Sequence, residues 1–217
     1  MPDAKIAVLI SGRGSNLKAL LDACADPDYP AEISLVISNK PKADGLEHAR
    51  AAGVTQAVID HRDFETREEF DAAVTERLRA AKVDYVCLAG FMRMLSADFV
   101  DEWRGRLINI HPSLLPAFRG LHVQERTLDG GVKIAGCTVH FVSAEMDAGP
   151  IVGQAAVPVL PGDTVETLSA RILEQEHRLY PASLRLIVEG AARISGAVVQ
   201  YDSQIKCEGS LINPPTD

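Results

Sequence analysis

Strand-like and helix-like segments alternate along the first half of the chain, and this alternation constrains the fold more than any other feature. Short apolar runs typical of buried strands are each followed by a segment whose apolar residues have helical spacing. The strand-like runs are 5–10, 33–38, 56–59, 84–89 and 107–111, and the helix-like segments are 17–25, 45–52, 66–81 and 96–102. Such alternation predicts a parallel sheet with helices on both faces.

The second half of the chain has longer segments in a different order. It predicts a helix, two long strands, a long helix and a small pair of strands, at 123–129, 133–142, 151–159, 163–180 and 192–200. One loop joins the two long strands, which predicts an antiparallel hairpin. Pro181 is expected to end or kink the long helix. From Tyr201 onward the polar sequence predicts a loosely ordered tail.

Length and composition bound the class of protein. The 217 residues, 47% of them hydrophobic and 24% charged, fit one globular domain. We predict a single domain over 1–200, with a Rossmann-like first half at 1–105 and a second half at 106–200, followed by the 201–217 tail. The fold class we predict is α/β, a mostly parallel sheet with an antiparallel C-terminal portion.

Charge and apolar patterning argue against several partners. The net charge of −8 argues against nucleic-acid binding, and no apolar run reaches the roughly 18 residues that a membrane span needs. The N-terminus lacks the pattern of a signal peptide. The four cysteines lie far apart, which indicates reduced, mostly buried thiols and a cytoplasmic location.

A glycine-rich turn follows the first strand. In Ser11-Gly12-Arg13-Gly14-Ser15-Asn16, the glycines permit a sharp turn and the close approach of a ligand. Ser15 or Asn16 is expected to cap the next helix, whose N-terminal N–H groups suit an anion. The motif alone favours a phosphate site and a plain strand-to-helix turn equally.

Two nucleotide-binding motifs do not fit this turn. A dinucleotide fingerprint needs a third glycine where this chain has Leu17, and an acid after the second strand, where the chain reads Ser38-Asn39-Lys40. A P-loop needs Gly-Lys-Ser/Thr, which is absent from this stretch of the sequence. If the turn binds an anion, a single phosphate suits it best.

Polar side chains at the end of the strand at 107–111 are candidates for catalysis. Asn109 and His111 are two residues apart and share a face of that strand, and Pro112 ends its hydrogen bonding. Asp147, in a later Gly-Pro loop, could keep the imidazole charged. An amide and an imidazolium can stabilise an oxyanion. With no evident nucleophile, the set suggests direct acyl transfer between two substrates.

A metal site is the weaker alternative for these residues. His111, His122, His140 and Asp147 are the side chains that would have to converge. Their spacing matches no common ligand motif. We therefore predict no metal.

Several long motifs occur together in an order that resembles one enzyme family. They are Val8–Leu17, Leu88–Leu95, Asn109–Pro116, Val139–Val142, Asp147–Pro150 and Gln175–His177. The chain resembles the phosphoribosylglycinamide formyltransferases, folate-dependent enzymes of purine biosynthesis, from about Lys5 to about Glu189. The resemblance implies a doubly wound sheet and transfer of a formyl group from 10-formyltetrahydrofolate, as co-substrate, to the amine of 5-phosphoribosylglycinamide. It leaves a homodimer open.

The resemblance also implies roles for individual residues. The catalytic set would be Asn109, His111 and Asp147. The phosphoribosyl substrate would be bound by Gly12, Arg13, Gly14, Ser15, Asn16, Gln175 and Glu176. The folate would be bound by Arg67, Met92, Arg93, Met94, Leu95, Asn109, Ser143, Ala144, Glu145, Met146 and Asp147. The 1–105 half would then bind phosphate, and the 106–200 half would carry folate binding and catalysis.

Three other activities remain open from sequence. Methionyl-tRNA formyltransferase and formyltetrahydrofolate hydrolase share the Asn-His-Asp plan. The first is expected to carry a further tRNA-binding domain and a basic surface, and the second an N-terminal regulatory domain, neither of which we expect in this acidic chain. The third is a folate- or nucleotide-binding protein without catalysis, which would bind ligand with no turnover.

Overall fold

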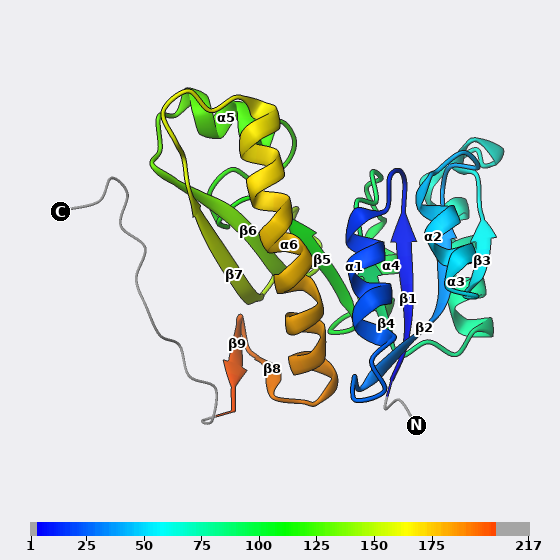
Figure 1. Cartoon of the computed structure of the whole chain (residues 1–217). Helices are drawn as coiled ribbons and strands as arrows, with labels where there is room; N and C mark the ends of the chain where they lie inside the picture. The colour runs from blue at the N-terminus through cyan, green and yellow to red at the C-terminus, as the bar shows by residue number, and fades with distance from the viewer. Residues whose placement is uncertain (1–3, 203–217) are drawn as a thin grey trace. The chain divides into compact units, whose positions relative to one another are not determined.

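The computed structural model describes residues 4–202 (Figure 1). The strands are β1 (Ala4–Ile10), β2 (Ala31–Ser38), β3 (Thr55–Val58), β4 (Tyr85–Leu88), β5 (Leu107–His111), β6 (Ile134–Phe141), β7 (Ile151–Pro158), β8 (Ala192–Ser195) and β9 (Val198–Tyr201). The helices are α1 (Ser15–Cys24), α2 (Gly45–Ala51), α3 (Arg67–Ala80), α4 (Ala97–Glu102), α5 (Val123–Asp129) and α6 (Val165–Val188), with a 3-10 turn η1 (His61–Asp63).

The strand order confirms the predicted fold class. Seven strands follow the order β3-β2-β1-β4-β5-β6-β7, and β8 and β9 form a separate two-stranded sheet. The pairs from β3 to β5 are parallel, and β6 and β7 pair antiparallel, as the hairpin prediction required. The described residues divide into two compact units, 4–109 with 141–144 and 110–140 with 145–202. The predicted single domain with halves at 1–105 and 106–200 stays a prediction.

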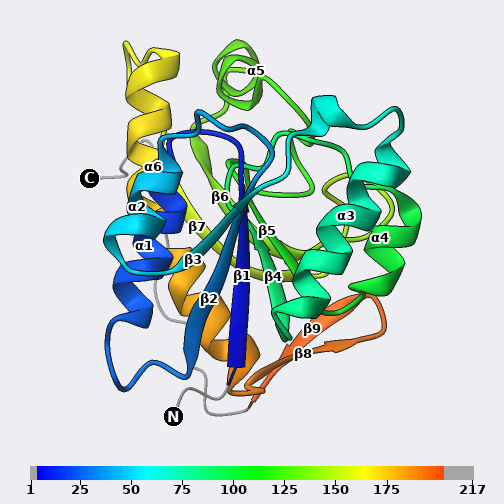
Figure 2. The same cartoon turned by 90° about the vertical axis from the view of Figure 1, so that its right-hand side faces the viewer.

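The first unit is doubly wound. The chain builds β1, β2 and β3 outward on one side and then returns to place β4 and β5 on the other side of β1. Helices α1 and α2 lie on one face of these strands, and α3 and α4 lie on the other (Figure 2). In such sheets, ligands bind beyond the carboxyl ends of the strands where the winding reverses. Here that point lies between β1 and β4.

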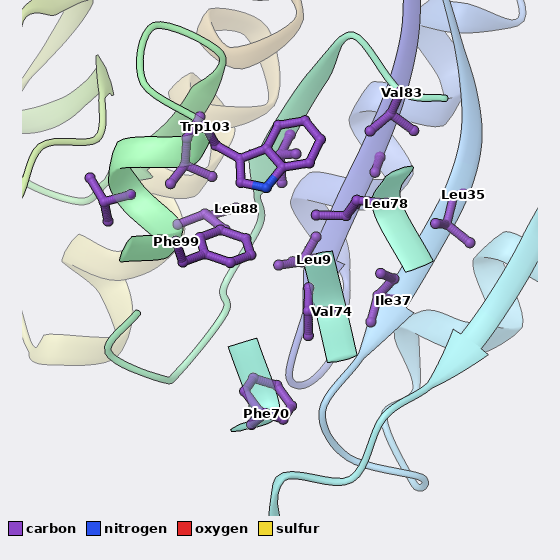
Figure 3. Packing of buried hydrophobic residues seen from close by; sticks show 14 residues of the cluster. Leu9, Leu35, Ile37, Phe70, Val74, Leu78, Val83, Leu88, Phe99 and Trp103 are labelled. Carbon is purple, nitrogen blue, oxygen red and sulfur yellow. The ribbon is translucent and has the colours of Figure 1, made fainter. Parts of the chain in front are cut away.

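A continuous apolar cluster packs α3 and α4 against one face of the sheet in this unit. Alternate residues of β1 and β2, such as Leu9 and Ile37, meet Phe70 and Val74 of α3, and Trp103 closes one side (Figure 3). Because β1 is buried on both faces, its sequence is almost wholly apolar rather than alternating. The core therefore fixes the carboxyl ends of β1 and β4.

Helix starts follow their capping residues. As predicted, Thr66 and Glu69 form a capping box that opens α3. Ser96 caps α4 by accepting the Phe99 N–H at 3.3 Å, and Thr164 opens α6 with a second capping box. These caps fix where each helix begins.

Two features at the C-terminal end differ from the sequence predictions. Helix α6 does not end at Pro181 but continues to Val188, and a kink at Pro181 stays a prediction. A proline inside a helix loses one backbone hydrogen bond, and the buried Leu184 and Ile187 of the last turns stabilise the continuation. Tyr201 does not begin a tail but ends β9, and its hydroxyl donates to the carbonyl of Val152. The rest of the predicted tail, 203–217, lies outside the described residues.

The three described cysteines are free thiols, as expected. Cys87 and Cys137 are buried and Cys24 is partly buried. Burial raises the pKa of Cys24 and of Cys137 to about 12, so these two thiols stay protonated and poorly reactive at neutral pH. Cys207 lies outside the described residues. Within residues 4–202, no helix has the length and apolar character needed to cross a membrane.

Asp163 ties the loop before α6 to the helix itself. Its carboxylate accepts the Leu160 N–H at 2.7 Å and pairs with both terminal nitrogens of Arg171, at 2.7 and 2.8 Å. The hydrogen bonds from Arg171 are the main reason why the pKa of Asp163 lies well below its usual range. The ionised carboxylate is therefore the form that stabilises the native state.

We expect Asp163→Asn to lower the free energy of unfolding by about 1.5–3 kcal/mol at neutral pH, the usual loss for a hydrogen bond to a charged group. Because the folded pKa is depressed, this stabilisation is present above the unfolded pKa of about 4 and is lost as the pH falls below it. Urea unfolding at pH 7 and pH 3 should show the difference from wild type shrinking at the lower pH. Asp22→Asn, which removes an exposed pair with Lys18, should change stability by less than about 1 kcal/mol. A loss for Asp163→Asn that does not vary with pH would contradict the assignment.

Candidate functional site

The glycine turn connects β1 to α1 without a side-chain cap. Gly14 is the N-cap residue, with φ 75° and ψ 26°, in the left-handed region. The expected caps are wrong, because Ser15 and Asn16 are already the first two residues of the helix. A left-handed N-cap favours glycine. Glycine has no side chain, so the N-cap residue of α1 makes no side-chain capping hydrogen bond. Arg13 is exposed and Asn16 is buried.

A second glycine, at the start of α2, makes this turn possible. Gly45 donates its N–H to the carbonyl of Gly12 at 3.0 Å. A Cβ on Gly14 would lie 2.5 Å from the Gly45 Cα, and a Cβ on Gly45 would lie 3.0 Å from the Gly14 Cα. Two backbones therefore touch here, where a side chain has no room. In contrast, a Cβ on Gly12 would have no atom of the described residues within 4 Å.

Gly14→Ala is expected to lower the free energy of unfolding by more than the roughly 1–2 kcal/mol of a left-handed non-glycine residue, because it adds a backbone clash. Gly53→Ala is the matched control, since Gly53 has φ +69° but open space around a Cβ. Urea unfolding of both variants separates the clash from the backbone strain. Equal losses in the two variants would show that the contact with Gly45 relaxes without cost.

Residues 91–96, which we call the 91–96 segment, follow β4 and carry four of the predicted folate residues. Two hydrogen bonds hold its backbone to the rest of the first unit. Near its start, the Met92 N–H donates to the Ser11 hydroxyl at 2.8 Å. At its end, the Ser96 N–H donates to the Asp71 carboxylate at 2.6 Å. The segment is therefore fixed at both ends by side chains of β1's carboxyl end and of α3.

The side chains of this segment divide into two kinds. Met92 and Met94 are 67% and 49% exposed, which is unusual for methionine and suits an apolar ligand. Leu95 packs against the buried cluster. The guanidinium of Arg93 lies over the Phe70 ring, 5.4 Å from its centroid. Alternate residues thus anchor the segment and present an apolar surface.

A cavity of about 320 Å³ lies on the α3 and α4 face of this unit, and none of the predicted site residues is among those that line it. Its charged lining residues are Glu68, Asp71, Glu76, Asp98, Glu102 and Arg79. Burial raises the pKa of Asp71 above its usual range. The excess of carboxylates disfavours the phosphate and folate substrates, both of which are anionic. This cavity is therefore not the site that the sequence predicts.

His111 is a buried imidazole with an oxygen facing each ring nitrogen. Its Nδ1 lies 3.4 Å from Asp147 Oδ2, and its Nε2 lies 3.0 Å from the carbonyl oxygen of Phe118. The same Asp147 oxygen accepts the Gly120 N–H at 2.9 Å, and the other oxygen lies 3.7 Å from Nε2 of His140. A neutral imidazole has one N–H, whereas an imidazolium has two. Nε2 therefore lies within hydrogen-bond distance of a carbonyl, and Nδ1 lies within ion-pair distance of a carboxylate.

The loop that supplies two of these contacts is held by Arg126 of α5. The guanidinium donates to the carbonyl of Arg119 at 2.6 Å and lies over the Phe118 ring, 5.7 Å from its centroid. Both Phe118 and Asp147 have positive φ, 53° and 50°. Non-glycine residues adopt such φ values when the surrounding contacts hold them there, which is common at functional sites.

The other predicted residues lie on regular elements or at their ends. Asn109 is two residues before His111 on β5, so both side chains project from one face of the strand. Gln175 and Glu176 lie on α6, and Glu176 is buried. Arg67 is the first residue of α3 and is exposed.

Each unit brings together a part of the predicted set. The first unit holds the glycine turn, Arg67, the 91–96 segment, Asn109, Ser143 and Ala144. The second unit holds His111, Glu145, Met146, Asp147, Gln175 and Glu176. Within them, Ser11 links the turn to the segment, and Asp147 meets His111. The individual substrate-binding roles stay predictions.

Sequence reasoning missed several residues that shape these parts. Ser11 directly precedes the glycines, and its position at the end of an apolar strand was the available signal. Gly45 had none, because it acts through a contact more than thirty residues away, and Arg126 had none, because it acts on a backbone carbonyl and a ring of a neighbouring loop. Toward His111, Phe118 presents its backbone oxygen, which leaves no trace in residue type.

Comparison with known proteins identifies a family. A family model described as formyl transferase matches residues 4–184. The phosphoribosylglycinamide formyltransferase of Haemophilus influenzae is 43% identical over 92% of this chain and 94% of its own length. The trifunctional purine biosynthetic protein adenosine-3 of Drosophila melanogaster is 55% identical over 89% of this chain. That protein is much longer, and the match covers only 14% of its length.

Solved structures agree with the sequence relatives. Glycinamide ribonucleotide transformylase 1 from Symbiobacterium toebii superposes with a TM-score of 0.89 at 52% identity, covering 91% of this chain and 93% of its own. Phosphoribosylglycinamide formyltransferase from Anaplasma phagocytophilum gives 0.87 at 45% identity, covering 94% and 96%. The chain therefore belongs to the formyl transferase family and, within it, to the phosphoribosylglycinamide formyltransferases.

Proposed function

We propose that this chain transfers the formyl group of 10-formyltetrahydrofolate to the amine of 5-phosphoribosylglycinamide. The products are formylglycinamide ribonucleotide and tetrahydrofolate, in purine biosynthesis. The observation that carries the proposal is the buried imidazole of His111 between the carboxylate of Asp147 and the carbonyl of Phe118. To stabilise an oxyanion and then donate a proton, the imidazole must exchange one of these two oxygen partners for the formyl oxygen, because even the imidazolium has only two N–H groups.

The reaction proceeds by direct transfer. The glycinamide amine attacks the formyl carbon, and the carbonyl oxygen takes up negative charge in a tetrahedral intermediate. Asn109 and His111, on one face of β5, donate hydrogen bonds to that oxygen. The carbon–nitrogen bond to the folate then breaks, and the leaving nitrogen takes a proton from His111 or a water molecule. The proton of the attacking amine passes to that same donor, which restores it. Asp147, whose Oδ2 lies 3.4 Å from Nδ1, orients the imidazole.

Each substrate has a proposed binding segment. The glycine turn and α1 bind the phosphate through backbone N–H groups, since the left-handed Gly14 places the turn at the start of the helix. Glu176 and Gln175 bind the ribose and glycinamide side. The exposed methionines of the 91–96 segment, with Arg67 and residues 143–147, bind the folate.

The decisive experiment is a spectrophotometric assay with 10-formyltetrahydrofolate, with and without 5-phosphoribosylglycinamide. We expect tetrahydrofolate to appear only in the presence of the ribonucleotide. Product at a similar rate without it would indicate a hydrolase instead. Binding of both compounds without product would indicate a ligand-binding protein. Five points stay predictions from sequence: that the protein binds no metal, no nucleic acid and no membrane, that a homodimer is possible, and that its location is cytoplasmic.

A further inference from the structure

Ser11 occupies the point of the first unit where the sheet winding reverses. It follows β1 directly, and its buried hydroxyl makes two hydrogen bonds. The hydroxyl donates to Oδ1 of Asn39 at 2.6 Å and accepts the Met92 N–H at 2.8 Å. Ser11 thus connects three segments: the glycine turn that follows it, Asn39 after β2 and Met92 after β4.

Asn39 is itself buried. Nδ1 of His61 lies 3.0 Å from its backbone carbonyl oxygen and 3.3 Å from its amide nitrogen. The amide oxygen accepts from the Ser11 hydroxyl, which leaves the hydroxyl lone pairs for the Met92 N–H. A buried hydroxyl with a fixed donor direction and a fixed acceptor direction has little freedom to move, so it holds the two segments at a set separation.

Asp71 holds the other end of the 91–96 segment. Its carboxylate accepts the Ser96 N–H at 2.6 Å, and its side chain comes from α3, which has no part in the glycine turn. Between these two ends, Leu95 packs against the buried cluster and Arg93 lies over the Phe70 ring, whereas Met92 and Met94 are exposed. The Met92 and Ser96 N–H contacts add to these side-chain contacts by holding the backbone of the segment near its start and at its end.

We propose that Ser11 and Asp71 are positioning residues for the folate, and that Ser11 also positions the phosphate turn and so serves both substrates. The inference rests on the proposed binding roles of the turn and the 91–96 segment. Its consequence is an asymmetry between the two residues. Losing the Ser11 hydroxyl should weaken binding of both substrates, whereas losing the Asp71 carboxylate should weaken only the folate.

The test compares Ser11→Ala and Asp71→Ala by equilibrium binding and by steady-state kinetics. Calorimetry with 10-formyl-5,8-dideazafolate and with 5-phosphoribosylglycinamide gives the two affinities separately. We expect Ser11→Ala to raise both dissociation constants and both KM values about three- to tenfold, the usual effect of one hydrogen bond. We expect Asp71→Ala to raise only the folate values, with kcat changed less than twofold in each case, because the contacts act on ground and transition states alike.

Three further variants separate positioning from a general loss of structure. Ser34→Ala removes a serine hydroxyl that bonds the Ile6 carbonyl at 3.4 Å, away from both segments, and should leave all values unchanged. Asp71→Asn keeps an oxygen that can accept the Ser96 N–H and should restore folate affinity. If Ser11→Ala does not fold, Asn39→Ala removes the group that orients the hydroxyl and should give the same double effect.

The outcomes distinguish this inference from the proposed function. Unchanged affinities in folded Ser11→Ala, or equal losses for both substrates in Asp71→Ala, would overturn the inference while wild-type formyl transfer leaves the function standing. If wild type instead showed no transfer, the function would fail, and the binding data alone would still support or overturn the positioning roles.

Discussion

His111→Ala is expected to lower kcat about a hundred- to a thousandfold, the usual effect of removing one donor to a developing oxyanion. The loss should fall mainly on kcat, because the imidazole acts on the transition state rather than on substrate binding. Steady-state kinetics with both substrates saturating measures it. His122→Ala is the matched control, since His122 is exposed and pairs with Glu125 on the surface. A folded His111→Ala protein with a kcat near that of wild type would remove His111 from the mechanism.

Asp147→Asn is expected to lower kcat by about a hundredfold or more, because it removes the negative charge that faces Nδ1 of His111 at 3.4 Å. An asparagine oxygen can still accept the Gly120 N–H, so the loop should keep its conformation. Steady-state kinetics with both substrates saturating measures the loss. Glu125→Gln, which removes a surface acid beside His122, is the control. A folded Asp147→Asn protein with a kcat near that of wild type would remove the carboxylate from the mechanism.

Local sequence signals predicted most of the fold. Short apolar runs predicted the seven strands of the larger sheet to within two residues. Parallel strands such as β1 are visible in this way because a strand buried on both faces is a continuous apolar segment. Thr66 and Glu69 predicted the start of α3 through a local capping box. The errors arose where contacts between residues distant in sequence determine the secondary structure. Helix α6 passes Pro181 because its last turns are buried, and Tyr201 belongs to a strand because it pairs with Ala192.

The candidate site shows the same division. His111 and Asp147 were predicted as a pair and lie together, since imidazole and carboxylate chemistry is visible in residue type. The Phe118 carbonyl and the Ser11 hydroxyl were not predicted as contacts, because a backbone oxygen and a single serine resemble many others in the sequence. Gly14 was predicted to permit a sharp turn and the approach of a ligand, yet the backbone that leaves no room for a side chain is that of Gly45, more than thirty residues later.

Gly12 and Gly14 stand two residues apart and are glycines for different reasons. The backbone of Gly45 lies against Gly14, so the fold itself requires a residue without a side chain at position 14. Gly12 has open space beside it within the described part of the chain, so the folded protein would accept a methyl group there. If the turn receives a phosphate, only the arriving molecule needs that space. Selection for stability alone would preserve Gly14. Selection for catalytic activity would be needed to preserve Gly12.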